Sequence, residues 1–132
     1  MIHRFRVKRG GFSIRPSEGT VPANWGGGGG TNLPYGAFSS LAEHLLGFMG
    51  IPEGVMVGYG GDKPWSDADE PLAPLMRMDD FQWDFSPEEC RRMAPRLREL
   101  VAQGDEYDIL TGTGLADDMD YCAARGLTLE FR

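Results

Sequence analysis

The sequence has few of the features that mark membrane proteins or disulfide-stabilised proteins. No run of eighteen apolar residues occurs in its 132 residues, so no membrane-spanning helix is predicted. The opening MIHRFRVKRGG alternates charged and apolar residues where a secretory signal would have an apolar core. Only two cysteines are present, and both fall on the apolar side of helix-like patterns, which predicts buried free thiols. We therefore expect a cytoplasmic protein without a membrane partner.

Residues that carry chemistry are also scarce. The candidate catalytic residues are His3, His44, Cys90 and Cys122. A nucleophilic thiol would need a histidine beside it and partial exposure, whereas both cysteines are expected to face inward. Six acidic residues lack a histidine in any metal-ligand spacing and predict a solvated helix face: Asp105, Glu106, Asp108, Asp117, Asp118 and Asp120. The sequence thus predicts no cofactor and no metal, and it favours a protein that is not an enzyme.

The composition is that of one ordinary globular domain, with 41% hydrophobic and 25% charged residues. The net charge of −7 is unevenly distributed. Five Arg and Lys residues face one Glu in the first twenty residues, so the remaining 112 carry a net charge of −11. Because an acidic body repels phosphate, we expect no nucleic-acid binding by the whole domain. The basic strand with Arg4, Arg6 and Lys8 is the only place where such contact remains open.

Strands are predicted at both ends of the chain. Period-two alternation predicts a strand over 2–8, a turn at Gly10-Gly11 and a partner strand over 12–16. A last strand over 127–131 is expected to pair with this hairpin, and a short strand is expected over 55–59. Residues 16–36 contain three prolines and seven glycines, five of them in a row, and predict one long, flexible Gly/Pro-rich loop within the single domain 1–132.

Three amphipathic helices are predicted between these strands. The first runs from Ala37 to about Gly47. The second begins at Ser86, where SPEE forms a capping box with proline at the first helical position, and it ends at Gly104 with a kink or a restart expected at Pro95. The third is expected from about Thr113 to Gly126. The predicted fold class is α+β, a small antiparallel sheet from the N- and C-terminal strands packed against two or three helices.

Two glycine-rich motifs are candidates for ligand binding. The five glycines after Trp25 end in Thr31-Asn32, so the Lys-Ser/Thr of a P-loop is missing and a flexible connector is favoured over an anion site. The stretch GYGGDKPW, 58–65, reads as a surface turn or as a polar-aromatic patch of Asp62, Lys63 and Trp65.

Residues 78–89 match part of the spacing of a calcium-binding EF-hand loop. This match places Asp80, Ser86 and Glu89 at suitable positions but puts Trp83 where glycine is required. Helix capping explains Ser86 and Glu89 equally well. We therefore expect no calcium site.

Four stretches resemble a family of small uncharacterised proteins from actinobacteria and their phages. They are KRGGFS, GYGGDKPWSDADEPLAPLM, FSPEECRRMAPRLREL and GLADDMDYCAARGLTLEF, which together cover most of the chain outside the glycine-rich loop. The family has no assigned activity, so the resemblance implies a bacterial or phage cytoplasmic protein and carries over no catalytic residue.

The leading functional hypothesis is a non-enzymatic interaction protein of the inhibitor, immunity or accessory type. It would bind a protein partner through an acidic, tryptophan-bearing surface with five residues: Trp25, Trp65, Trp83, Asp62 and Lys63. The alternative is a small-ligand or nucleotide-binding domain in which the glycine-rich loop is a lid over Tyr35, His44 and Lys63.

Overall fold

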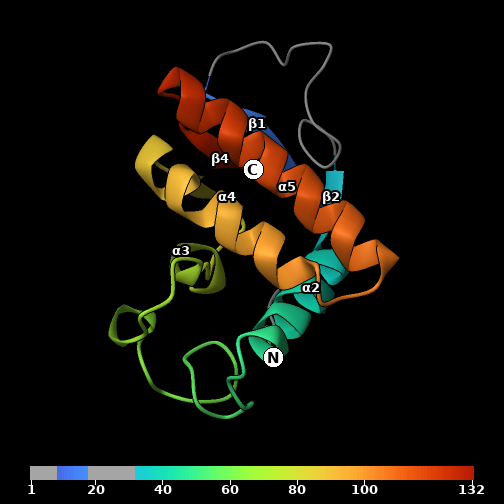
Figure 1. Ribbon diagram of the computed structural model, residues 1–132, viewed down its shortest axis with the longest axis vertical. Coiled ribbons are helices and arrows are strands. Elements are labelled where there is room, and N and C mark those ends of the chain that lie inside the picture. Colours follow the sequence, from blue (N-terminus) through green and yellow to red (C-terminus); the bar gives the residue numbers. More distant parts are fainter. Residues whose placement is uncertain (1–8, 18–31) are drawn as a thin grey trace.

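The computed structural model describes residues 9–17 and 32–132, which form an α+β fold (Figure 1). The predicted strand 2–8 and the glycine run lie outside these residues. The helices are α2 (Tyr35–Phe48), α3 (Ala73–Met76), α4 (Pro87–Val101) and α5 (Glu106–Arg125), with a 3-10 helix η1 (Trp65–Asp67). The strands are β1 (Gly11–Pro16), β2 (Asn32–Pro34), β3 (Trp83–Phe85) and β4 (Leu129–Phe131). The predicted fold class is confirmed.

The four strands form one antiparallel sheet in the order β2-β1-β4-β3. Phe12 of β1 is opposite Leu33 of β2, and Ile14 is opposite Phe131 of β4. The predicted pairing of the last strand with the strand over 12–16 is therefore confirmed. Arg15 is opposite Glu130, which places opposite charges directly across the two strands.

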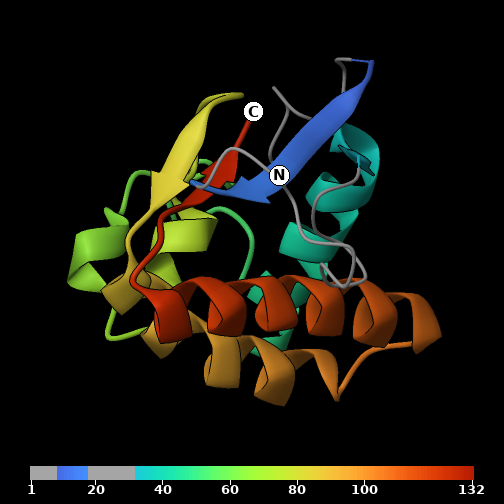
Figure 2. The same ribbon diagram turned by 90° about the horizontal axis from the view of Figure 1, so that it is seen from above.

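The sheet lies over α5, and α4 packs along the other side of α5 (Figure 2). Every second residue of the central strands points to this core, because side chains alternate across a strand. The Phe12 ring meets the rings of Phe38 and Phe131 edge-on at centroid distances of 5.5 and 5.3 Å. Such edge-to-face pairs stabilise a core beyond the area that they bury. Helix α2 thus closes one end of the sheet.

Local signals define both long helices. Ser86 accepts a hydrogen bond from the Glu89 amide, and the Glu89 carboxylate accepts one from the Ser86 amide, which confirms the predicted capping box of α4. Pro95 lies inside α4, and the helix continues past it to Val101, so the expected restart does not occur. Gly126 ends α5 in the left-handed conformation with φ of 67°, as expected for a glycine stop.

Two predicted boundaries and one predicted strand are wrong. Helix α5 starts at Glu106, before the predicted Thr113, because Asp105 and Asp108 form a second capping box. The end of the predicted loop 16–36 forms β2 and the first residues of α2. Residues 55–59 make only isolated bridges, because the chain turns at Gly58 and Gly60, both with positive φ.

Candidate functional site

The tryptophan at position 65 lies in the interior. Its side chain is 2% exposed, and its Nε1 donates a hydrogen bond to the Val57 carbonyl oxygen at 3.1 Å. The Tyr59 ring packs against it edge-on, 5.6 Å away between centroids. Trp65 therefore holds the 55–65 loop closed, and the expectation that its ring is a surface anchor for a partner is wrong.

Trp83 keeps part of its side chain exposed and lines a surface hollow. It begins β3, at the edge of the sheet, where it is opposite Phe131. The other lining residues are Val57, Pro64, Trp65, Ser66, Arg77 and Asp79. We call this the Trp83 hollow. Asp62 and Lys63 are exposed on the adjoining turn, so the fold gathers most of the predicted partner-binding residues that it describes near one place.

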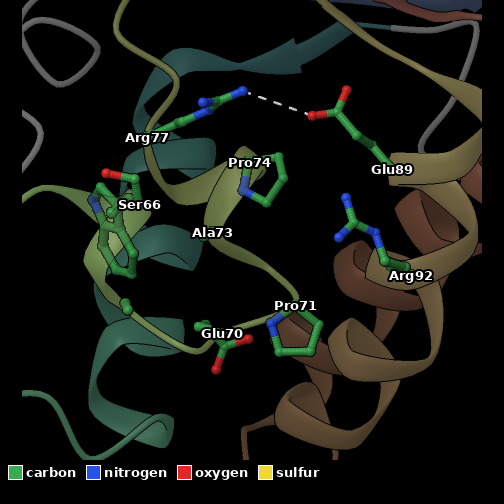
Figure 3. Close-up of a pocket in the computed structure, with 10 residues that line it drawn as sticks. Ser66, Glu70, Pro71, Ala73, Pro74, Arg77, Glu89 and Arg92 are labelled. Atoms are coloured by element: carbon green, nitrogen blue, oxygen red, sulfur yellow. Dashed lines mark ion pairs between the residues drawn. The ribbon is translucent and has the colours of Figure 1, made fainter.

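A second recess adjoins the first and shares Trp65, Ser66 and Arg77 with it. Its volume is about 250 Å³, and it lies between the η1–α3 segment and α4 (Figure 3). Two prolines and two alanines form apolar parts of its wall, and charged residues form the rest: Ala68, Pro71, Ala73, Pro74, Glu70, Arg77, Glu89 and Arg92. We call it the arginine cleft. The exposed residues Ser66 and Arg77 therefore border both recesses.

The charges around the arginine cleft are unevenly paired. The Arg77 guanidinium lies 3.7 Å from the Glu89 carboxylate (Figure 3). Glu70, 7% exposed, is held by Arg96 through Nη2 at 2.8 Å and by the Leu72 amide at 2.8 Å. Because Arg96 also pairs with Glu99, its charge is compensated twice. Arg92 makes no hydrogen bond or ion pair with any described residue.

The alternative site of Tyr35, His44 and Lys63 is not assembled. Tyr35 and His44 are nine residues apart on α2, about two and a half turns, so their side chains leave opposite faces of the helix. Tyr35 packs against Phe12 and Phe81 in the core. The lid proposed for this site falls mostly outside the described residues.

His44 instead joins two helices. Its Nδ1 lies 2.8 Å from Oδ1 of Asp108, whose side chain is 5% exposed, while the imidazole itself is 48% exposed. The same aspartate closes the capping box of α5. A buried carboxylate is thereby satisfied from two sides, and the contact fixes α2 against the start of α5. His44 therefore has a structural role, since its Nδ1 contact joins α2 to α5. No nucleophilic side chain among the described residues is paired with its Nε2.

The two cysteines are buried free thiols, as predicted. Burial raises the pKa of Cys90 to about 12, with a smaller contribution from Cys122, so its thiolate is disfavoured at neutral pH. Cys122 lies fourteen residues along α5 from Asp108, about 21 Å from the helical turn that His44 contacts. The described candidates therefore form no Cys–His pair. His3 lies outside the described residues.

The acidic residues of α5 do not form one solvated face, contrary to expectation. Asp117 and Asp120 both pair with Arg98, at 2.6 and 2.7 Å. Asp108 and Asp118 are buried, and neither carboxylate oxygen of Asp118 has a hydrogen-bond partner among the described residues. Burial, together with the neighbouring Asp117, raises the pKa of Asp118 to about 8. In the described parts of the chain, no three His, Cys, Asp or Glu residues are grouped closely enough to hold a metal ion.

The residues of the candidate calcium loop have other roles. Glu89 holds the Ser86 amide with one carboxylate oxygen and faces Arg77 with the other. Asp80 accepts a hydrogen bond from the Phe81 amide. Helix capping therefore explains the spacing of Ser86 and Glu89.

One exposed apolar surface was not predicted. Tyr107, Ile109 and Leu110 are 57%, 43% and 72% exposed near the start of α5. We call these three residues the α5 patch. The sequence pattern does not group them, because it predicts a helix that begins only near Thr113, after all three residues. The capping pair Asp105 and Asp108 is the signal that would have found this turn.

Comparisons with other proteins give no functional assignment, so the proposals below are argued from the geometry of the site. No protein-family model, no curated protein and no solved structure matches the chain. The resemblance to the actinobacterial and phage family thus stays a prediction. In the described ranges, no helix is both long enough and apolar enough to cross a membrane.

Proposed function

We propose that this chain is a non-enzymatic interaction protein of the inhibitor, immunity or accessory type, and that it binds a protein partner through the Trp83 hollow. One observation carries the proposal. The part-exposed Trp83 and the 47% exposed Val57 line the same open recess, with Pro64 beside them. Aromatic side chains in recessed, partly desolvated positions supply a large share of the binding energy in protein interfaces.

The surroundings of the hollow favour a protein partner. Exposed acidic residues occur throughout the adjoining segment: Asp62, Asp67, Asp69, Asp79 and Asp80. Charged residues around an apolar centre steer a partner and reject wrong ones. The buried thiols and the tether role of His44 give catalysis little support. Free thiols also fit the reducing cytoplasm, where we place the protein.

The test is affinity purification of the tagged protein from a lysate of its native host, with variants compared by mass spectrometry. Val57→Glu puts a charge into the hollow at an exposed position, and Trp83→Ala removes the aromatic ring. Tyr107→Ala is the control, because it removes an exposed aromatic ring from the α5 patch. Thermal unfolding of each variant verifies that it is folded.

A stoichiometric partner that is lost with Val57→Glu and Trp83→Ala and retained with Tyr107→Ala is the expected result. A partner retained by both hollow variants would place the interface elsewhere. A partner lost only with Tyr107→Ala would move it to the α5 patch. Recovery of no stoichiometric partner would refute the proposed function.

A further inference from the structure

One of the positive charges that line the arginine cleft, that of Arg92, has no ion-pair partner among the described residues. Arg92 projects from α4 toward the space between Pro74 and Glu89 (Figure 3). The other three arginines of α4, by contrast, all have acceptors among the described residues: Arg91, Arg96 and Arg98. Arg92 has no such acceptor among the described residues, although the protein carries a net charge of −7. An unpaired guanidinium at a recess is a site for an external anion.

A second guanidinium faces the same recess. Arg77 lies across the cleft from α4, and its contact with Glu89 is long, at 3.7 Å. Glu89 and Arg92 are three residues apart on α4 and are neighbours on its surface. Glu89 is already held by the Ser86 amide through the capping box, so it stays in place if Arg77 turns toward another acceptor. The two arginines can therefore both form ion pairs with one carboxylate, each from its own side of the cleft.

The remaining wall favours a peptide over a small inorganic anion. Pro71, Pro74 and the two alanines provide apolar surface next to the charged groups. A free anion would leave this surface in contact with water, whereas a peptide would cover it with its own apolar atoms. The cleft also shares Ser66 and Arg77 with the Trp83 hollow, so one segment of chain can contact both recesses.

We propose that the arginine cleft binds an aspartate or glutamate side chain of an extended segment of the protein partner, with Arg92 and Arg77 as the carboxylate-binding residues. The proposal rests on the proposed function, since it names the chemistry that the partner presents next to the Trp83 hollow. The acidic body opposes long polyanions at a distance, so one or two carboxylates in an otherwise uncharged segment fit better than a polyacidic tract.

The experiment uses the full chain and random dodecapeptides displayed on phage, selected on the immobilised protein. Selected peptides are synthesised with a fluorescent label, and their dissociation constants are measured by fluorescence anisotropy. The variants are Arg92→Gln and Arg92→Lys. Arg91→Gln is the matched control, since it makes the same change of charge one position away on the same helix and outside the cleft.

The expected result has three parts. The selected peptides contain an Asp or Glu at a common position, and replacing it by Asn or Gln weakens binding about tenfold, the loss of one charge-assisted hydrogen bond. Arg92→Gln weakens binding by a similar factor and abolishes the preference for the carboxylate, while Arg92→Lys keeps part of it. Arg91→Gln leaves both unchanged.

Several results would overturn the inference. These are selection of no binding peptide, selection without a common acidic position, or equal effects of Arg91→Gln and Arg92→Gln. Displacement of the peptides by millimolar inorganic phosphate with no preference for the acidic residue would identify a small-anion site instead.

Failure here is distinguishable from failure of the proposed function. A partner captured from the host that depends on Trp83 and not on Arg92 would refute the inference and leave the proposed function standing. Selection of acidic peptides that depend on Arg92, with no partner captured from the host, would refute the proposed function and leave the carboxylate-binding cleft standing.

Discussion

Asp118 is the residue whose replacement has the most informative consequence. Its side chain is buried, and neither carboxylate oxygen has a hydrogen-bond partner in the part of the chain that the structure describes; burial raises its pKa to about 8. In the unfolded chain its pKa is that of an ordinary aspartate, about 3.9. The folded protein therefore binds more protons than the unfolded chain between these two pKa values. The free energy of unfolding must fall as the pH rises through this window.

The magnitude follows from the separation of the two pKa values. Below about pH 4 the carboxyl is protonated in both states and contributes no pH dependence. Between pH 5 and pH 7 each pH unit lowers the free energy of unfolding by about 1.4 kcal/mol, or about 3 kcal/mol in total. Above about pH 8 the loss is complete. We expect Asp118→Asn to remove this dependence, because the amide stays neutral and has nearly the same shape.

The assay is urea unfolding followed by circular dichroism at pH 5, 6, 7 and 8. The difference in unfolding free energy between Asp118→Asn and the wild type should grow by about 3 kcal/mol from pH 5 to pH 7 in favour of the variant. The control is Asp84→Asn, which removes a 55% exposed carboxyl that is paired with Arg132 and does not contribute to the raised pKa of Asp118, so the pH dependence of the wild type should persist in this variant. A difference that stays flat over this range would refute the claim that the Asp118 carboxylate is buried without compensation.

Three further substitutions test the packing. Trp65→Ala should lower the free energy of unfolding by about 3–5 kcal/mol in urea denaturation, because the ring is buried. A smaller decrease in unfolding free energy, together with loss of partner binding, would indicate that Trp65 is a surface anchor after all. Ser86→Ala should lower it by about 1 kcal/mol, while Ser66→Ala, outside any cap, should not. Gly112→Ala drives its Cβ into the Val101 side chain and should lower the melting temperature. The double variant with Val101→Ala should recover most of the loss, and no recovery would contradict the contact.

The sequence predicted best what neighbouring residues decide. Helix α4 has its capping box, its proline at the first helical position and its apolar spacing within one stretch, so its limits were predicted closely. The start of α5 was missed because Asp108 takes the place of the usual Glu or Gln in its box and because Gly112 and Gly114 weaken the apolar pattern.

Features that depend on distant residues were not predictable in the same way. Val55 and Val57 alternate like a strand, yet Met56 and Tyr59 are the buried residues, since the core that they meet is built by α3 and η1. Arg92 and Arg96 look alike on α4, and only the position of Glu70, twenty-six residues away, distinguishes the paired arginine from the unpaired one. The candidate site thus required the tertiary structure.

The position of β1 in the sheet has a consequence for the order of folding. This strand is bonded to β2 on one edge and to β4 on the other, and its partners Ile14 and Phe131 are more than a hundred residues apart. During synthesis, the β1–β4 ladder cannot form until residue 131 has left the ribosome exit tunnel. The hairpin of α4 and α5, by contrast, joins adjacent segments and has a low cost of loop closure. We expect the two helices to associate first on the nascent chain, and the sheet to close onto them as the last cooperative step.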